Sequence, residues 1–155
     1  RFDDENKQAG LKFEDMISKG EVLEYAQYGV NMYGTPKAPV DKWLSEGKTV
    51  VLKIEVQGAK NIKEMYPDSV GIFLLPPSME VLEKRLRSRG TETEEDIRRR
   101  LEIARDEIHK SVDYDYFVIN DELETASDDV LTIIKALDFS HKRMNNFISE
   151  VIDNV

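Results

Sequence analysis

The chain has 155 residues, with 31 acidic and 22 basic side chains, so its formal net charge is −9, which argues against non-specific nucleic-acid binding. This length fits one domain with or without small insertions, and a chain that is 40% hydrophobic and 34% charged has the composition of a globular protein. The chain has no cysteine, which excludes a disulfide scaffold, a thiolate metal site and a cysteine nucleophile and fits a cytoplasmic location. No apolar run approaches the ~18 residues of a membrane-spanning helix.

The N-terminal part of the chain predicts short helices and a hairpin. Residues 11–19 place apolar side chains on one helical face, and Gly20 suits the end of that helix. Residues 22–33 are rich in strand formers and predict a β-hairpin with its turn near Gly29. Residues 39–46 then predict a short helix.

The pattern next changes to one that is typical of a parallel sheet. Residues 49–54 and residues 70–75 are nearly continuous apolar runs, as expected of strands that are buried on both faces. Residues 58–66 predict a helix between them. This part of the chain therefore predicts a strand–helix–strand unit.

Further helices and one more strand follow. Ser78 suits the N-cap of a helix over residues 79–88, and a second helix is expected over residues 94–110. Residues 115–119 predict another buried strand. A last helix is expected over residues 122–137, and its pattern can continue beyond them.

The order of these elements predicts an α/β protein with a small parallel sheet, preceded by a mixed α+β insert. In open parallel sheets, ligands bind outside the carboxyl ends of the strands. Those ends lie at residues 55–58, 76–78 and 120–121. Three aromatic side chains are expected in the core: Trp43, Phe73 and Phe117.

Two acidic residues stand in suggestive surroundings. Glu24 lies in the predicted hairpin with residues 31–35, where a tyrosine adjoins a Gly-Thr turn; this set could read a polar ring and a phosphate, or it could be ordinary hairpin chemistry. Glu55 follows a predicted buried strand, where a carboxylate is costly without a partner. A ligand amine or a hydrated cation would supply that partner, and Gly58 would admit close approach of the backbone.

The arginines are concentrated in one part of the chain. Seven of the nine lie between Arg85 and Arg105. One interpretation is a solvated helix face, because Glu and Asp are interleaved with the arginines, and spacing alone favours it. The other is a phosphate site, since arginine grips phosphate with a planar fork of donors.

Four segments resemble the guanylate kinase family in order and spacing. They are LEYAQYGVNMYGTP, KIEVQGAKNI, FLLPPSMEVLEKRLRSRGTETEEDIRRRL and DYFVIND, and the resemblance covers roughly residues 11–140. It implies a P-loop nucleoside monophosphate kinase fold, with a parallel sheet core, a GMP-binding α+β insert and a helical lid. It also implies phosphoryl transfer from ATP to GMP with Mg²⁺, giving ADP and GDP, within purine nucleotide metabolism.

The resemblance implies roles on the GMP side. Glu24 resembles the carboxylate that accepts hydrogen bonds from the guanine ring, Tyr33 the tyrosine that contacts the GMP phosphate, and Thr35 the hydroxyl residue that helps to hold the base. Glu55 resembles the acid near guanine and the hydrated metal. Lys53 stands where the family often has a further acid.

The resemblance also implies roles on the ATP side. Arg89 and Arg100 resemble the lid arginines that reach the transferring phosphate, and Asn120 resembles the residue beside the adenine of ATP. For these two arginines the phosphate interpretation is therefore preferred to the solvated face. The other members of the cluster are still expected mostly at the surface: Arg87, Arg98, Arg99 and Arg105.

The resemblance places the GMP-binding region in residues 1–46, the core in residues 47–86 and 112–155, and the lid in residues 87–111. The family's first strand and P-loop have no counterpart, so we expect this chain alone to lack phosphotransfer. Two explanations are open. The chain is a truncated or incomplete guanylate kinase, or it is a catalytically inactive guanylate-kinase-like domain that binds a nucleotide or a phosphorylated protein.

Overall fold

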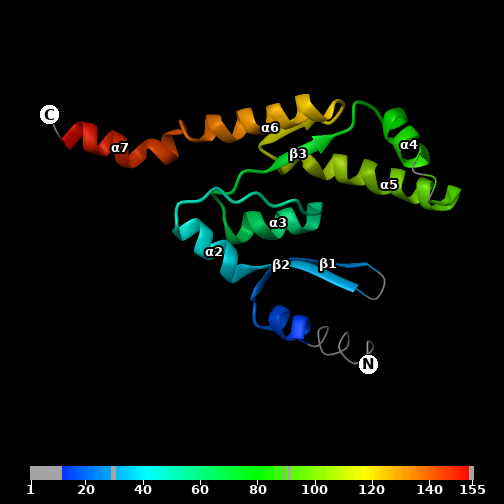
Figure 1. The fold of residues 1–155 in the computed structure, drawn as a ribbon, viewed down its shortest axis with the longest axis horizontal. Coiled ribbons are helices and arrows are strands. Elements are labelled where there is room, and N and C mark those ends of the chain that lie inside the picture. The colour runs from blue at the N-terminus through cyan, green and yellow to red at the C-terminus, as the bar shows by residue number, and fades with distance from the viewer. Residues whose placement is uncertain (1–11, 29–30, 89, 91, 154–155) are drawn as a thin grey trace. The chain divides into compact units, whose positions relative to one another are not determined.

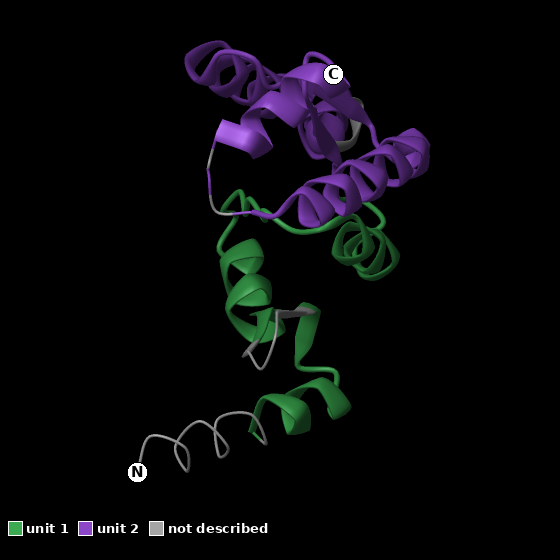
Figure 2. Cartoon of the chain, turned by 90° about the vertical axis from the view of Figure 1, so that its right-hand side faces the viewer, with its two compact units in different colours: residues 1–69 green, residues 70–155 purple. Residues whose placement is uncertain are grey.

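The computed structural model describes residues 12–28, 31–88, 90 and 92–153, and its elements follow the predicted order with one exception (Figure 1). The chain divides into two units, residues 1–69 and residues 70–155 (Figure 2). Within the described residues, no helix is both long enough and apolar enough to cross a membrane.

An antiparallel hairpin carries three of the predicted GMP-side residues. Its strands are β1 (Val22–Tyr28) and β2 (Asn31–Pro36). The register places Glu24 directly opposite Thr35. Residues that face each other across an antiparallel pair lie on the same face, so the pairing brings these two side chains together.

The hairpin agrees with the prediction except at its end. Residues 12–18 form the expected helix before β1, and the predicted turn at Gly29 lies outside the described residues. β2 continues through Gly34 and Thr35, which therefore belong to a strand rather than to the predicted turn.

Two helices complete the first unit. They are α2 (Lys37–Ser45) and α3 (Val56–Met65), and each begins two residues before its predicted start. Three buried side chains form the core of this unit, and four partly buried ones pack against them: Leu23, Val40 and Ile62, with Val50, Leu52, Ile54 and Tyr66.

The predicted strand over residues 49–54 is wrong. These residues form no regular strand, although alternate side chains pack against the core of the unit while the others, such as Val51 at 69% exposed, face outward. An apolar run specifies burial, but a strand also needs a neighbour for its backbone hydrogen bonds. Among the described residues, no strand pairs with this segment.

The second unit contains a parallel sheet made of two of the three predicted strands, so the predicted strand–helix–strand unit is not formed in the described part of the chain. β3 (Ile72–Leu75) pairs with β4 (Tyr116–Ile119), and Leu75 lies opposite Ile119. The carboxyl ends of the two strands therefore meet at one edge of the sheet. This edge carries the predicted ligand-binding segments that follow each strand.

The helices of the second unit follow the predicted pattern. α4 (Met79–Ser88), α5 (Glu94–Lys110) and α6 (Leu123–Leu137) agree with the predicted helices, and the expected continuation is a separate helix, α7 (His141–Asp153). Five apolar side chains join α4 to α5: Leu86, Ile97 and Leu101, with Met79 and Leu82.

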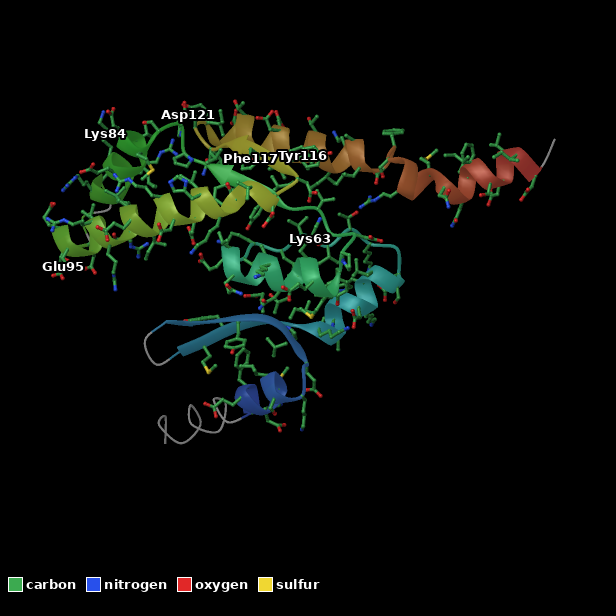
Figure 3. The ribbon with its side chains drawn as sticks, turned by 180° about the vertical axis from the view of Figure 1, so that it is seen from behind. Lys63, Lys84, Glu95, Tyr116, Phe117 and Asp121 are labelled. Atoms are coloured by element: carbon green, nitrogen blue, oxygen red, sulfur yellow. The ribbon has the colours of Figure 1, made fainter. Side chains whose placement is uncertain are left out.

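Two of the three aromatic residues expected in the core are not buried. Phe117 is 49% exposed and Trp43 is 44% exposed, whereas Phe73 is partly buried and packs against Phe117 with ring centroids 6.1 Å apart. Successive side chains of a strand face opposite sides, and the side of β4 that is covered takes Val118. Phe117 therefore lies on the open side; Figure 3 labels it on β4.

A hydrogen-bonded clamp ties α2 to the residue after α3. The Tyr66 hydroxyl donates to Asp41 Oδ1 at 2.6 Å, and Lys37 forms an ion pair with the other oxygen of the same carboxylate. The hydrogen bonds from Lys37 and then Tyr66 lower the pKa of Asp41. The clamp therefore holds together the two helices that contribute Val40 and Ile62 to the core.

Tyr66→Phe should lower the free energy of unfolding of the first unit by about 0.5–1.5 kcal/mol, since it removes one hydrogen bond and keeps the packed ring. The measurement is urea unfolding followed by the fluorescence of Trp43, the single tryptophan, which lies in α2. Tyr25→Phe is the control, because Tyr25 is half exposed in the same unit. Equal effects of the two variants would contradict a stabilising clamp.

Candidate functional site

The first part of the candidate site is one face of the hairpin. Glu24 is only 9% exposed, and its Oε1 accepts a hydrogen bond of 2.6 Å from the Thr35 hydroxyl. Tyr33 lies two residues before Thr35 in β2, so its side chain is on the same face, where it is 59% exposed. The hairpin thus combines a held carboxylate, a hydroxyl and an accessible phenol.

The first turn of α3 lies against the same carboxylate. A β-carbon on Gly58 would lie 3.1 Å from Glu24 Cβ and 3.3 Å from Glu24 Oε2. The N-terminus of a helix carries partial positive charge, which favours a carboxylate beside it. The described contacts therefore hold Glu24 between a strand hydroxyl and a helix turn.

Glu55 stands at the start of that helix. It is the N-cap residue of α3, its side chain makes no capping hydrogen bond, and it is exposed. Lys53 is also exposed, and the alternation of buried and exposed residues puts both side chains on the outer side of the segment. The side chains of Glu55 and Lys53 are therefore both exposed to solvent on the same side of this segment.

Gly34 is a residue whose role the sequence analysis did not identify. A β-carbon there would lie 2.5 Å from the Glu24 carbonyl oxygen and 2.8 Å from Phe13 Cζ. The close approach of β2 to β1 at Glu24 therefore requires glycine. A glycine within a strand pattern indicates a possible close approach of the backbone. Only the structure shows that the approach of Gly34 is to the Glu24 carbonyl oxygen.

The second part of the candidate site is the predicted lid, residues 87–111, which includes the last residues of α4 and all of α5. Arg100 Nε lies 3.1 Å from Glu92 Oε2, and the Glu92 side chain is 12% exposed against 49% for Arg100. Thr93 begins α5, with its hydroxyl oxygen accepting from the Asp96 N–H. Arg89 lies outside the described residues.

The remaining arginines of the cluster lie at the surface, as expected. Arg87 bonds to Glu83 and to Glu94, and the hydrogen bond from Arg87 lowers the pKa of Glu94. The others are exposed side chains of α5: Arg98, Arg99 and Arg105. Lys84 and Glu95, labelled in Figure 3, are likewise exposed on these two helices.

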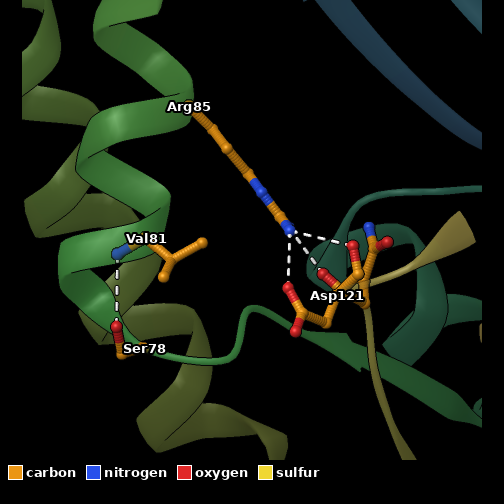
Figure 4. Close-up of polar contacts among 5 residues, drawn as sticks. Ser78, Val81, Arg85 and Asp121 are labelled. Atoms are coloured by element: carbon orange, nitrogen blue, oxygen red, sulfur yellow. Dashed lines mark hydrogen bonds and ion pairs between the residues drawn. The ribbon is translucent and has the colours of Figure 1, made fainter.

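Arg85 has a different task from the rest of the cluster. Its guanidinium donates to the carbonyl oxygens of Asn120 at 2.5 Å and Asp121 at 3.0 Å, and to Asp121 Oδ1 at 3.2 Å (Figure 4). The Asn120 N–H donates to the Leu75 carbonyl at 2.7 Å. The segment that follows β4 is therefore held by α4 on one side and by β3 on the other.

A hollow of about 200 Å³ opens at the same edge of the sheet. Its lining combines four apolar residues with two polar ones: Leu74, Pro76, Leu82 and Leu86, with Arg85 and Asn120. An apolar wall with a few polar groups is a common lining of small-molecule sites.

The described residues contain no group of three or more His, Asp or Glu side chains arranged to hold a metal ion. Mg²⁺ usually keeps several waters and is bound through one or two carboxylates together with substrate phosphates. Glu55, which the sequence analysis placed near a hydrated metal, is an exposed carboxylate at the start of α3.

Comparisons with known proteins agree on one family. Residues 9–137 match the sequence profile described as guanylate kinase. The chain is 49% identical over 139 residues to a guanylate kinase of Clostridioides difficile, covering 90% of this chain and 68% of that protein. It is 46% identical over 134 residues to a guanylate kinase of Carboxydothermus hydrogenoformans, covering 86% of this chain and 66% of that protein.

A solved structure gives the same result for the fold. The crystal structure of guanylate kinase from Anaplasma phagocytophilum superposes with a TM-score of 0.68 and 32% identity, covering 85% of this chain and 64% of that chain. The chain thus spans about two thirds of the length of the relatives it matches.

Arg85→Met should loosen the segment after β4, because methionine keeps the apolar stem and loses the three donated hydrogen bonds. We expect the protection of the Asn120 amide against hydrogen exchange to fall by about threefold to tenfold, a modest effect because the ion pair is partly solvated. Arg99→Met, which removes an exposed pair within α5, is the control and should leave this amide unchanged. Unchanged protection in the Arg85 variant would show that the bonds do not hold the segment.

Proposed function

The chain belongs to the guanylate kinase family, and we propose that the protein containing it transfers a phosphoryl group from ATP to GMP, giving ADP and GDP. The observation that carries this proposal is the buried Glu24 carboxylate, fixed by the Thr35 hydroxyl at 2.6 Å on an accessible face of the hairpin. A buried carboxylate is costly unless hydrogen-bond donors satisfy it. Guanine supplies two adjacent donors, at N1 and N2, and adenine does not.

On the GMP side, each residue has a distinct task in this proposal. Glu24 accepts hydrogen bonds from the guanine ring, and Thr35 holds the Glu24 carboxylate and contacts the base. The Tyr33 hydroxyl donates a hydrogen bond to the GMP phosphate. The exposed Tyr33 side chain is available for a ligand, which supports this role. Glu55 lies near the base and the hydrated metal.

On the ATP side, Arg100 and Arg89 bind the transferring phosphate, and Asn120 lies beside the adenine. The Arg100 side chain is 49% exposed beside its ion pair with Glu92, which supports contact with phosphate oxygens. The hollow lined by Leu74, Leu82 and Asn120 supports adenine binding at the edge of the sheet. Residues 87–111 are the lid in this proposal.

The chemistry is an in-line displacement, in which the GMP phosphate oxygen attacks the γ-phosphorus and the bond to the ADP oxygen breaks. The protein positions the two nucleotides and neutralises the charge that develops on the transferred group, with little covalent work of its own. Mg²⁺ bound with ATP would supply further charge neutralisation at the phosphates. Closure of the lid would exclude water and so prevent hydrolysis of ATP.

A catalytically inactive domain that binds a nucleotide or a phosphorylated protein is the alternative. The chain combines GMP-side residues with lid arginines and Asn120 on the ATP side. A module that binds one ligand has no need of both sets, which supports the enzyme.

The full-length protein that contains this chain should phosphorylate GMP and not AMP. The physical reason is that the Glu24 carboxylate accepts hydrogen bonds, and the edge of adenine offers it an unprotonated N1 instead of a donor. A coupled assay of ADP formation with each acceptor measures this preference. Equal turnover of AMP and GMP would contradict the role of Glu24.

Glu24→Gln should weaken GMP binding by about 1–3 kcal/mol, because a charge-assisted acceptor is replaced by a neutral one in a largely buried position. Calorimetric titration with GMP measures the change. Glu21→Gln, at an exposed position just before β1, is the matched control and should bind GMP normally. Unchanged affinity in the Glu24 variant would remove that residue from the base site.

A further inference from the structure

The space beside Gly58 is occupied by the side chain of a single residue, Glu24. The three heavy atoms nearest to a β-carbon placed on Gly58 would all belong to Glu24: Cβ at 3.1 Å, Cγ at 3.2 Å and Oε2 at 3.3 Å. The first turn of α3 therefore lies along the whole length of the Glu24 side chain, from its β-carbon to its carboxylate.

This contact leaves the carboxylate little freedom. Its Oε1 is held by the Thr35 hydroxyl at 2.6 Å, its Oε2 lies 3.3 Å from the position of a β-carbon on Gly58, and the residue is 9% exposed. A free glutamate side chain loses rotamer entropy when a ligand immobilises it. Here the fold has already immobilised the side chain, which raises affinity by preorganisation.

We propose that Gly58 is a positioning residue for base specificity, because the absence of a side chain there sets where the Glu24 carboxylate meets guanine. This inference rests on the proposed function of Glu24. Gly58 itself touches no base in this proposal and acts through the carboxylate. A methyl group at position 58 would displace that carboxylate by a few tenths of an ångström or break its bond to Thr35.

Gly71 provides a matched control for the effect of adding a methyl group at a closely packed glycine. A β-carbon on Gly71 would also meet its nearest neighbour at 3.1 Å, but that neighbour is Tyr114 Cδ1, in the second unit. Neither glycine has a positive φ, so alanine is compatible with both backbones. At Gly58 alanine also suits the helix, because its helix propensity is higher than that of glycine.

The test places Gly58→Ala and Gly71→Ala in the full-length protein that contains this chain and compares them with the full-length wild-type protein by steady-state kinetics in both nucleotides. A misplacement of 1 Å can cost about a hundredfold, so a shift of a few tenths should raise the KM for GMP by roughly threefold to tenfold in Gly58→Ala. The KM for ATP should stay within about twofold, and Gly71→Ala should keep both values.

A second measurement makes the result independent of turnover. The ¹³C signal of the Glu24 carboxyl group, observed by NMR in the free protein, should shift in Gly58→Ala and stay in place in Gly71→Ala. Absence of GMP phosphorylation by the wild-type protein would refute the proposed function, and this signal would then decide whether Gly58 positions the carboxylate.

Three outcomes would overturn the role of Gly58. They are an unchanged KM for GMP with an unshifted Glu24 signal, an equal rise of both KM values, and loss of the folded circular dichroism spectrum in Gly58→Ala alone. The last would show that the contact supports the fold of the unit rather than the position of one carboxylate.

Discussion

The buried carboxylate of Glu24 is the constraint around which the first unit is built. A carboxylate at 9% exposure must be surrounded by groups that compensate for lost hydration, and the Thr35 hydroxyl supplies one of them at 2.6 Å. The same position excludes side chains at Gly34, which meets the Glu24 backbone, and at Gly58, which meets its side chain. Glu24 is thus the point at which β1, β2 and the first turn of α3 approach one another most closely in the described contacts.

The arginines of α4 and α5 differ in the groups that they contact. Arg87 is satisfied by Glu83 and Glu94 within its own helix pair, and Arg85 is committed to the backbone after β4. Arg100 is engaged at Nε by a nearly buried Glu92, while half of its side chain remains exposed. The position of the carboxylates, and not the number of arginines, therefore separates structural from available guanidinium groups.

Helices and the parallel pair were predictable from the sequence, because their apolar periodicity and caps are local signals. Ser78, for example, accepts from the Val81 N–H at the start of α4. The predicted strand over residues 49–54 was wrong, because a strand needs a partner strand from elsewhere in the chain and the local sequence pattern does not reveal one. Among site residues, the pairing of Glu24 with Thr35 follows from a hairpin register, whereas the contact with Gly58 joins segments 34 positions apart and could not be inferred from either one.

Recognition of guanine by Glu24 is tested most directly by the ratio of affinities for GMP and inosine monophosphate, which lacks the 2-amino group. Calorimetry on the wild-type protein should give a preference for GMP of about tenfold or more, the worth of one hydrogen bond to a charged acceptor. In Glu24→Ala that preference should fall to within about twofold, because the acceptor for the amino group is gone. The same ratio in both proteins would contradict guanine recognition by Glu24.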